Sequence, residues 1–175
     1  MMDRTKILSH LTKEELLSLI QQKDSFMKSN AIKDRDEVVS ILRTQNVGYD
    51  KENLFVVVFN RQSNIVDILI YQSGCKDAIK FDVDLVLKDI LRVPNANAII
   101  MAHNHPEGGV KHSEADLIST MQISAGIHLI GLSLWDSVVF DSFDYSSIMT
   151  DNRKTVLKFF KDINKAFKHE VFKEI

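Results

Sequence analysis

Hydrophobic and polar positions follow two different periods along this chain of 175 residues, so both strands and helices are expected. Residues 54–60 (LFVVVFN) and 98–102 (AIIMA) are continuous apolar runs of strand length, typical of strands buried on both faces. The turn residues 61–64 (RQSN) follow the first of these runs and precede another apolar stretch. We therefore expect residues 54–60 and 64–72 to pair as a hairpin.

Apolar residues spaced three and four positions apart predict helices elsewhere in the chain. The predicted segments are residues 12–28, 34–45, 82–93, 113–124 and 152–172. In the last three, the residues expected to face inward are Val83, Leu87, Ile90 and Leu91; Leu117, Ile118 and Met121; and Val156, Phe159, Phe160, Ile163 and Phe167. Residues 127–140 predict two strand-like runs interrupted near Asp136 and Ser137, and residues 144–148 predict a short edge strand.

The order of these elements is β-β-α-β-α-β-β with helices at both ends. It predicts an α+β protein in which a mixed sheet lies between helices, close to a three-layer arrangement. The length suits one domain with additions at its ends. We expect a helical segment at residues 1–46, one domain at 47–150, and a docked C-terminal helix at 151–175.

Residues with metal-binding chemistry follow the apolar run 98–102. His103 and His105 are separated by one residue, so a continued strand would point both imidazoles to the same side. A glycine-containing loop follows, and Asp116 then falls in the first turn of the next predicted helix. Two imidazoles and one carboxylate form a three-ligand set that leaves a fourth position open for water, as in catalytic zinc sites.

Cys75 is the only cysteine, so no four-ligand cage of Cys and His is available. We expect Cys75 to be a small core or strand-end residue.

The same residues can also be explained by structural roles that involve neither metal binding nor catalysis. Ser113 and Asp116 fit the capping box S-x-x-D at a helix start. Two histidines beside a loop can occur by chance. His112 is better described as a loop residue than as a ligand, and Asn104 suits a loop held by hydrogen bonds to the main chain. On residue types alone, a metal site and a purely structural helix cap both remain possible interpretations.

A longer sequence pattern, which includes both histidines, Ser113 and Asp116, favours the metal site. His103-x-His105-Pro106, with seven residues between His105 and Ser113 and two more before Asp116, resembles the JAMM signature of the JAB/MPN metalloprotease superfamily. The string HNHPEGG…HSEAD is most similar to the RadC-like branch, whose pattern is HNHPSG followed by PSxxD. The resemblance extends from about Glu52 to about Ser147. Three positions depart from the branch: Glu107 replaces a Ser, His112 replaces a Pro, and Asp136-Ser137 replaces an Asp-His pair.

The resemblance implies the mixed sheet of the JAB/MPN (cytidine-deaminase-like) fold and a Zn²⁺ ion held by His103, His105 and Asp116. It also implies that Glu52 is the general base and that Ser113 stabilises an oxyanion or orients water. The expected activity is that of a zinc peptidase or isopeptidase acting on a peptide or protein substrate. A DNA-repair or mobile-element protein of RadC type and a non-catalytic JAB scaffold are the alternatives.

Charge and composition narrow the expected partners. The formal net charge of -2 provides no overall footprint for nucleic acid, and no Gly precedes Gly48, where RadC-like proteins carry a Gly-containing helical hairpin. Direct DNA binding is therefore possible as a family property but not supported by these residues. The N-terminus lacks the apolar core of a signal peptide, no run has the length of a membrane span, and one cysteine excludes a disulfide framework. These features predict a cytoplasmic protein with no membrane partner.

Overall fold

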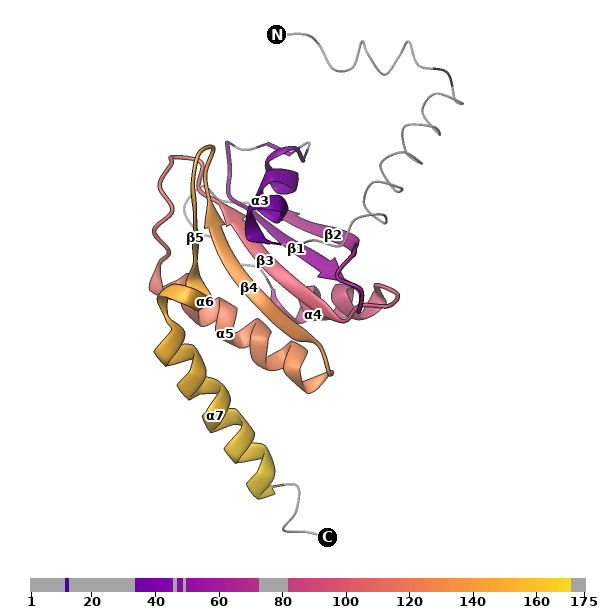
Figure 1. Ribbon diagram of the computed structural model, residues 1–175, viewed down its shortest axis with the longest axis vertical. Coiled ribbons are helices and arrows are strands. Elements are labelled where there is room, and N and C mark those ends of the chain that lie inside the picture. The colour runs from indigo at the N-terminus through magenta and orange to yellow at the C-terminus, as the bar shows by residue number, and fades with distance from the viewer. Residues whose placement is uncertain (1–11, 13–33, 46, 49, 73–81, 171–175) are drawn as a thin grey trace.

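A mixed sheet between helices forms the body of the protein, as the computed structural model shows (Figure 1). The structure describes residues 12, 34–45, 47–48, 50–72 and 82–170, with side chains up to residue 165. Its elements are α3 (Arg35–Arg43), β1 (Asn53–Phe59), β2 (Ile65–Gln72), α4 (Val83–Arg92), β3 (Ala98–Asn104), α5 (Glu114–Leu129), β4 (Ser133–Phe140), β5 (Tyr145–Ser147), α6 (Ile148–Asp151) and α7 (Arg153–Glu170). The predicted α+β class, with a mixed sheet between helices, is confirmed.

The described strands are arranged in the order β2-β1-β3-β4-β5. β1 pairs antiparallel with β2, which confirms the predicted hairpin, and also antiparallel with β3. β3 pairs in parallel with β4, and β5 closes the edge antiparallel to β4. Every residue of β1 and β3 is buried, which agrees with the continuous apolar runs of these two strands.

Helices cover both faces of the sheet, and the period of two along each strand decides which side chain meets which helix. On one face, α3 packs Val38, Val39 and Leu42 against a core that includes Phe55 and Phe140. On the other face, α4 and α5 pack against the alternate residues of the same strands. α3, which belongs to the expected 1–46 segment, therefore packs one side against the core of the sheet domain.

The register of β1 against β3 positions the site. Leu54 pairs with His103 in this antiparallel ladder. Continuing the same register by two residues places Glu52 opposite His105, although 53 positions separate them in the sequence. Glu52 and His105 both belong to the set of alternate residues whose side chains face α5. The N-terminus of α5 lies along this side of the sheet, and it carries Asp116.

The sequence expectation of a strand that begins at residue 127 is wrong. Residues 127–129 belong to the end of α5 and form no strand, because the buried face of this helix continues to Ile127 and ends only before Gly131, whose φ is 79°. β4 is one strand through Asp136 and Ser137, but its pairing with β3 shifts register between Leu134 and Asp136, close to the interruption expected from the sequence. These two buried polar residues are accommodated in the strand because Asp136 forms an ion pair with Arg35 and Ser137 is hydrogen-bonded to Thr120.

Several expected inward faces also need correction. Ile118 and Leu91 are 50% and 61% exposed, because the buried sides of α5 and α4 are centred on Ile123 and Ile90. In α7, Val156 is buried while Phe159, Phe160 and Ile163 are half-buried. The predicted helix at 12–28, Cys75 and the side chain of Phe167 lie outside what the structure describes, apart from Thr12. Among the described residues, no helix has the length and apolar character needed to cross a membrane.

Candidate metal centre

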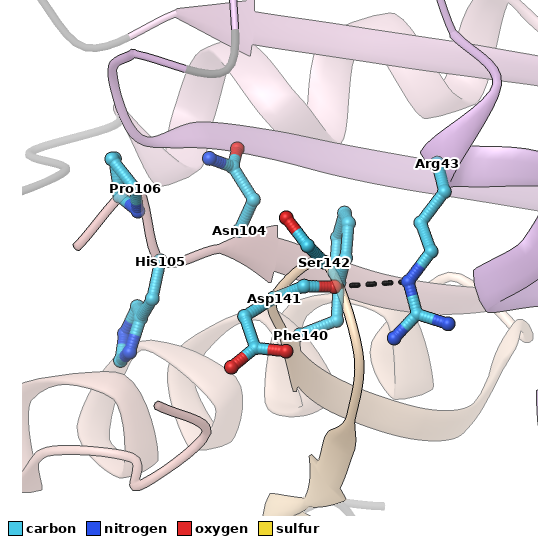
Figure 2. A pocket seen from close by; sticks show the side chains of 7 residues that line it. All are labelled: Arg43, Asn104, His105, Pro106, Phe140, Asp141 and Ser142. Carbon is cyan, nitrogen blue, oxygen red and sulfur yellow. Dashed lines mark hydrogen bonds between the residues drawn. The ribbon is translucent and has the colours of Figure 1, made fainter. Parts of the chain in front are cut away.

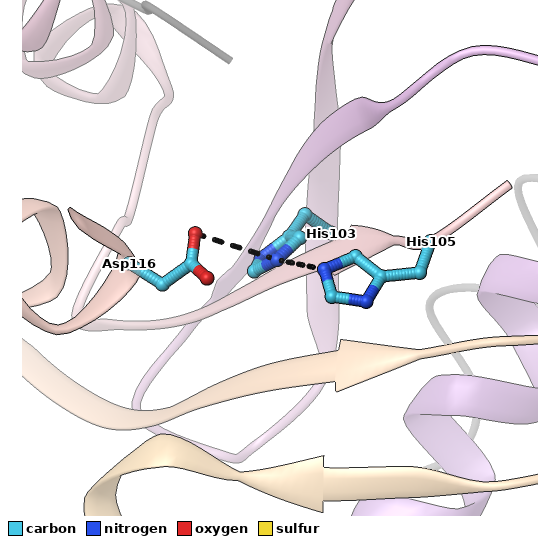
Figure 3. A group of neighbouring side chains, drawn as sticks. All are labelled: His103, His105 and Asp116. Carbon is cyan, nitrogen blue, oxygen red and sulfur yellow. Dashed lines mark hydrogen bonds and ion pairs between the residues drawn. The ribbon is translucent and has the colours of Figure 1, made fainter. Parts of the chain in front are cut away.

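His103 and His105 stand at the end of β3 with their rings turned toward each other (Figure 3). Their Nε2 atoms are 3.2 Å apart, which confirms that the two imidazoles point to the same side. His103 is the last residue of β3 that pairs with β1, and it is 7% exposed. The strand geometry therefore brings two imidazole nitrogens to one point at the rim of the sheet.

Asp116 completes the group from the first turn of α5. Its Oδ1 lies 3.5 Å from His103 Nε2, and the donor atoms of the three residues all lie within 4.8 Å of one another. Two ligand atoms that each bind one tetrahedral ion at about 2.1 Å are roughly 3.4 Å apart. The observed separations thus fit three ligands of a single ion, and the role of these residues as ligands stays a prediction.

The tautomer of His105 follows from its second ring nitrogen. Nδ1 lies 3.0 Å from the carbonyl oxygen of Gly109. A carbonyl can only accept, so Nδ1 carries the hydrogen and Nε2 of the neutral ring keeps its lone pair for the shared centre. The Gly109 N–H in turn donates to Asp141 Oδ2 at 2.8 Å. Asp141 therefore orients His105 through the main chain of a single residue, Gly109.

Sequence reasoning missed Asp141. Its carboxylate also accepts from the main-chain N–H groups of Phe143 and Asp144 at 2.8 Å each. The N–H groups of Asp144, Phe143 and Gly109 hold the pKa of the Asp141 carboxyl below its usual value. An Asp that follows a strand and precedes a tight turn is a recognisable signal for this local role. Its link to the distant Gly109 had no signal in the sequence.

Burial dominates the electrostatics of His103. Desolvation lowers the pKa of His103 to about 4, against the opposing effect of the Asp116 carboxylate and with smaller contributions from His105 and His112. The imidazole is therefore neutral over the physiological pH range. A neutral imidazole is the form that binds a metal.

Ser113 is the N-cap of α5. Its hydroxyl donates to Asp116 Oδ2 at 2.8 Å and accepts from the Asp116 N–H at 3.2 Å, while its own N–H donates to Oδ2 at 2.7 Å. The capping box read from the sequence is therefore present. It also leaves Asp116 Oδ1 directed at His103. The oxyanion role expected for Ser113 stays a prediction, and it requires the hydroxyl hydrogen to leave Oδ2.

Glu52 precedes β1 and stands beside the two histidines. Its Oε1 lies 4.0 Å from His105 Nε2, and both side chains are 21% exposed. This separation is too long for a direct hydrogen bond and matches two groups that share one water. The antiparallel register of β1 and β3 thus brings the carboxylate expected to act as general base to the group formed by His103, His105 and Asp116.

The remaining sequence candidates lie around this group. His112 is held by Asn152, whose Nδ2 lies 2.8 Å from its Nε2, and it is not part of the three-residue group. Glu107 is exposed in the loop after His105. The Asn104 side chain is hydrogen-bonded to the main chain of residues 51–53, so it joins two segments and holds more than its own loop.

A cavity of about 280 Å³ opens beside His105. Its lining residues are Arg43, Asn104, His105, Pro106, Phe140, Asp141 and Ser142 (Figure 2). Arg43 comes from α3, and it donates from Nε to the Asp141 carbonyl and from Nη2 to the Asp144 carbonyl, at 2.9 Å each. α3 therefore fixes the turn between β4 and β5 that forms one wall. Sequence reasoning did not predict this cavity, because its walls come from three separate segments.

Known proteins have sequences similar to this chain. The chain is 28% identical over 130 residues to a UPF0758 protein of Vibrio cholerae, an alignment that covers 74% of this chain and 80% of that protein. It is 27% identical over 144 residues to a UPF0758 protein of Finegoldia magna and spans 62% of the length of that relative. The sequence model of the RadC-like JAB domain matches residues 32–172, well over half of the chain, and this protein therefore belongs to the RadC-like JAB domain family.

Proposed function

We propose that this chain is a zinc-dependent hydrolase that cleaves an amide bond in a peptide or protein, as a peptidase or isopeptidase. The observation that carries the proposal is the convergence of His103, His105 and Asp116 on one point, with a carboxylate of Glu52 4.0 Å from His105 Nε2. Three donors leave one tetrahedral position for water or substrate, which distinguishes catalytic from structural zinc sites. Membership of the JAB domain family supports the same class of chemistry.

The donor set favours zinc over harder cations. Two imidazoles and one carboxylate suit Zn²⁺, whereas Mg²⁺ and Ca²⁺ prefer oxygen ligands. Zn²⁺ held by these three residues would lower the pKa of water to about 7 and polarise the substrate carbonyl. The burial of His103 keeps its imidazole neutral for this purpose.

Glu52 is proposed as the proton carrier of the reaction. Its carboxylate accepts a proton from the attacking water as the water oxygen bonds to the carbonyl carbon. When the carbon–nitrogen bond breaks, the same carboxyl group gives that proton to the leaving amine. Ser113 supports this chemistry because its hydroxyl donates to Asp116 Oδ2. The other carboxylate oxygen, Oδ1, then faces His103 Nε2.

The cavity beside His105 supports a polypeptide substrate. It shares His105 with the proposed centre, and its walls combine apolar Phe140 and Pro106 with the charged side chains of Arg43 and Asp141. A mixed lining of this kind suits one side chain of a peptide next to the bond that is cleaved. The cavity therefore provides a binding position that a water-activating centre alone would lack.

Metal analysis of the purified, zinc-supplemented protein tests the proposal. We expect about one zinc per chain, as for a single three-ligand site. Zinc should be lost in His103→Ala, His105→Ala and Asp116→Ala and retained in Glu52→Gln. The native protein should hydrolyse members of a fluorogenic peptide-amide and isopeptide panel, and Glu52→Gln should do so only at a small residual rate.

The alternatives give other results. A native protein without stoichiometric zinc would leave the non-catalytic scaffold as the better description. DNA titrations at two salt concentrations address the remaining alternative, because a protein that neutralises many phosphates loses affinity steeply with salt. With a net charge of -2 we expect weak DNA binding, and a tight, salt-steep complex would favour the DNA-associated function.

A further inference from the structure

β1 and β3 separate at the end where the site lies. Their register runs from Phe59 and Ala98 to Leu54 and His103. Two residues after His103, the main-chain N–H of His105 donates to the carbonyl of Phe140 in β4 at 2.9 Å. The chain after β3 therefore follows β4 and leaves β1 without its main-chain partner. This divergence creates the space between Glu52 and His105.

The side chain of Asn104 spans the divergence. Its Oδ1 accepts from the Asn53 N–H at 2.9 Å, and its Nδ2 donates to the Lys51 carbonyl at 2.9 Å. A primary amide offers the same acceptor and donor as a peptide group. Asn104 thus replaces the main-chain peptide unit that β3 no longer supplies. Its two bonds fall on the residues immediately before and after Glu52.

Asn53 strengthens this attachment from the other strand. Its Nδ2 lies 3.0 Å from Asn104 Oδ1, 2.9 Å from the Lys51 carbonyl and 3.0 Å from the Gly48 carbonyl. Asn53 and Asn104 are 0% and 3% exposed, on the side of the sheet opposite to Glu52 and His103. Buried hydrogen bonds of this kind are strong constraints on the backbone, because water does not compete for them.

The contacts require this type of side chain at position 104. An aspartate would keep the acceptor for the Asn53 N–H but would lose the donor to the Lys51 carbonyl and bury a charge. Alanine would lose both bonds. Since Asn104 lies between His103 and His105 in the sequence, any shift of its amide relative to the 51–53 main chain also shifts Glu52 relative to the histidines.

We propose that Asn104, supported by Asn53, is a positioning residue that sets the carboxylate of Glu52 at its working distance from His103 and His105. The inference rests on the proposed function, because that distance matters only if Glu52 moves a proton. The amide joins the base to the histidines through the far side of the sheet and touches none of the reacting atoms, although the Asn104 side chain also lines the cavity beside His105.

Crystal structures of metal-free Asn104→Ala and Asn104→Asp test the geometry without any need for activity. We expect the distance from Glu52 Oε1 to His105 Nε2 to lengthen beyond the 4.0 Å of the native protein. The matched control is Asn60→Ala, since Asn60 Oδ1 accepts from the N–H groups of Gln62 and Asn64 at 2.9 and 3.0 Å near the other end of β1. This variant also loses two bonds to the main chain, but Glu52 should stay in place.

Kinetics on a fluorogenic peptide amide separate positioning from general stability. Asn104→Ala should lower kcat by roughly 10- to 100-fold with little change in KM, because small displacements of a catalytic group have effects of this size. In the Glu52→Gln background the same substitution should change the residual rate by less than about threefold, since coupled residues are not additive. Asn60→Ala should leave kcat unchanged.

The inference is overturned if Glu52 keeps its position in both Asn104 variants, or if the two substitutions lower the rate independently. A native protein that binds no zinc would instead overturn the proposed function. In that case the Glu52 to His105 distance in the metal-free variants would still decide whether Asn104 positions Glu52.

Discussion

His105 and Asp116 each use one polar atom to hold their side chain in place and keep the other for the shared centre. His105 commits Nδ1 to the Gly109 carbonyl, and Asp116 commits Oδ2 to Ser113. His103 depends more on burial, which keeps its ring neutral. At the scale of single residues, the site is therefore prepared for a cation before any cation binds.

The depressed pKa of His103 predicts an acid-labile metal-free protein. Burial lowers its pKa to about 4 from the ordinary value of 6.5, so between these two pH values the unfolded chain binds more protons than the folded one. The contribution of His103 to stability is complete above pH 6.5 and is lost as the pH falls toward 4. Urea unfolding in chelator-containing buffer at several pH values measures this. His103→Gln should show a flatter pH dependence, and an equal slope would contradict the prediction.

At the scale of elements, the N-terminus of α5 combines a helix cap with a candidate ligand. Ser113 and Asp116 satisfy each other's main-chain N–H groups, and the same bonds determine where Asp116 points. The role of Ser113 and Asp116 as a helix cap is therefore compatible with the predicted role of Asp116 as a metal ligand. The helix cap is itself the device that orients the carboxylate.

Ser113→Ala should affect stability and metal binding together. Loss of the N-cap hydroxyl should lower the free energy of unfolding by about 1 kcal/mol. Zinc affinity should fall by roughly tenfold, because Asp116 loses a partner that orients it. Asp34→Ala is the control, since Asp34 caps α3 by accepting from the Glu37 N–H. Chemical denaturation and competition with a zinc indicator measure the two effects, and an unchanged affinity in Ser113→Ala would refute the orienting role.

At the scale of the whole molecule, the layers are joined by a few long-range polar contacts in addition to apolar packing. Arg35 of α3 forms an ion pair with Asp136 of β4, and Asp136 Oδ1 also accepts from Ser147 at 2.7 Å. Asp136 is 1% exposed, so its charge depends on these partners. The contact ties the helix before β1 to the strand that carries the wall of the cavity.

Arg35→Met should destabilise the protein by roughly 2 kcal/mol, less than the ~3–5 kcal/mol typical of a fully buried pair. The reduction reflects the Arg35 side chain, which is 45% exposed and partly screened by solvent. The double variant Arg35→Met/Asp136→Asn should recover part of the loss, because no buried charge is then left alone. Arg92→Met, which breaks the exposed pair with Asp89, should change the urea midpoint little. Equal effects of the two single variants would refute the account.

Local patterns in the sequence were sufficient for much of the fold and for part of the site. Strand and helix periods identified the hairpin, the buried strand before His103 and the helix that carries Asp116, because these patterns reflect the burial of neighbouring positions. They misplaced the end of α5. Within β4, the buried polar residues Asp136 and Ser137 interrupt the apolar pattern where the pairing with β3 shifts register, and their partners, Arg35 and Thr120, lie far away in the sequence.

The sequence by itself determined the motif strand, the common side of His103 and His105, and the capped helix that brings Asp116, since each depends on residues within one turn or one pleat. Tertiary structure alone decided that Glu52 faces His105, that Asn104 holds the main chain on both sides of Glu52, and that Asp141 orients His105 through Gly109. These contacts arise from the pairing of β1 with β3 and of β3 with β4. Strand pairing is set by the burial of whole faces of the sheet, and no local period of a single strand encodes it.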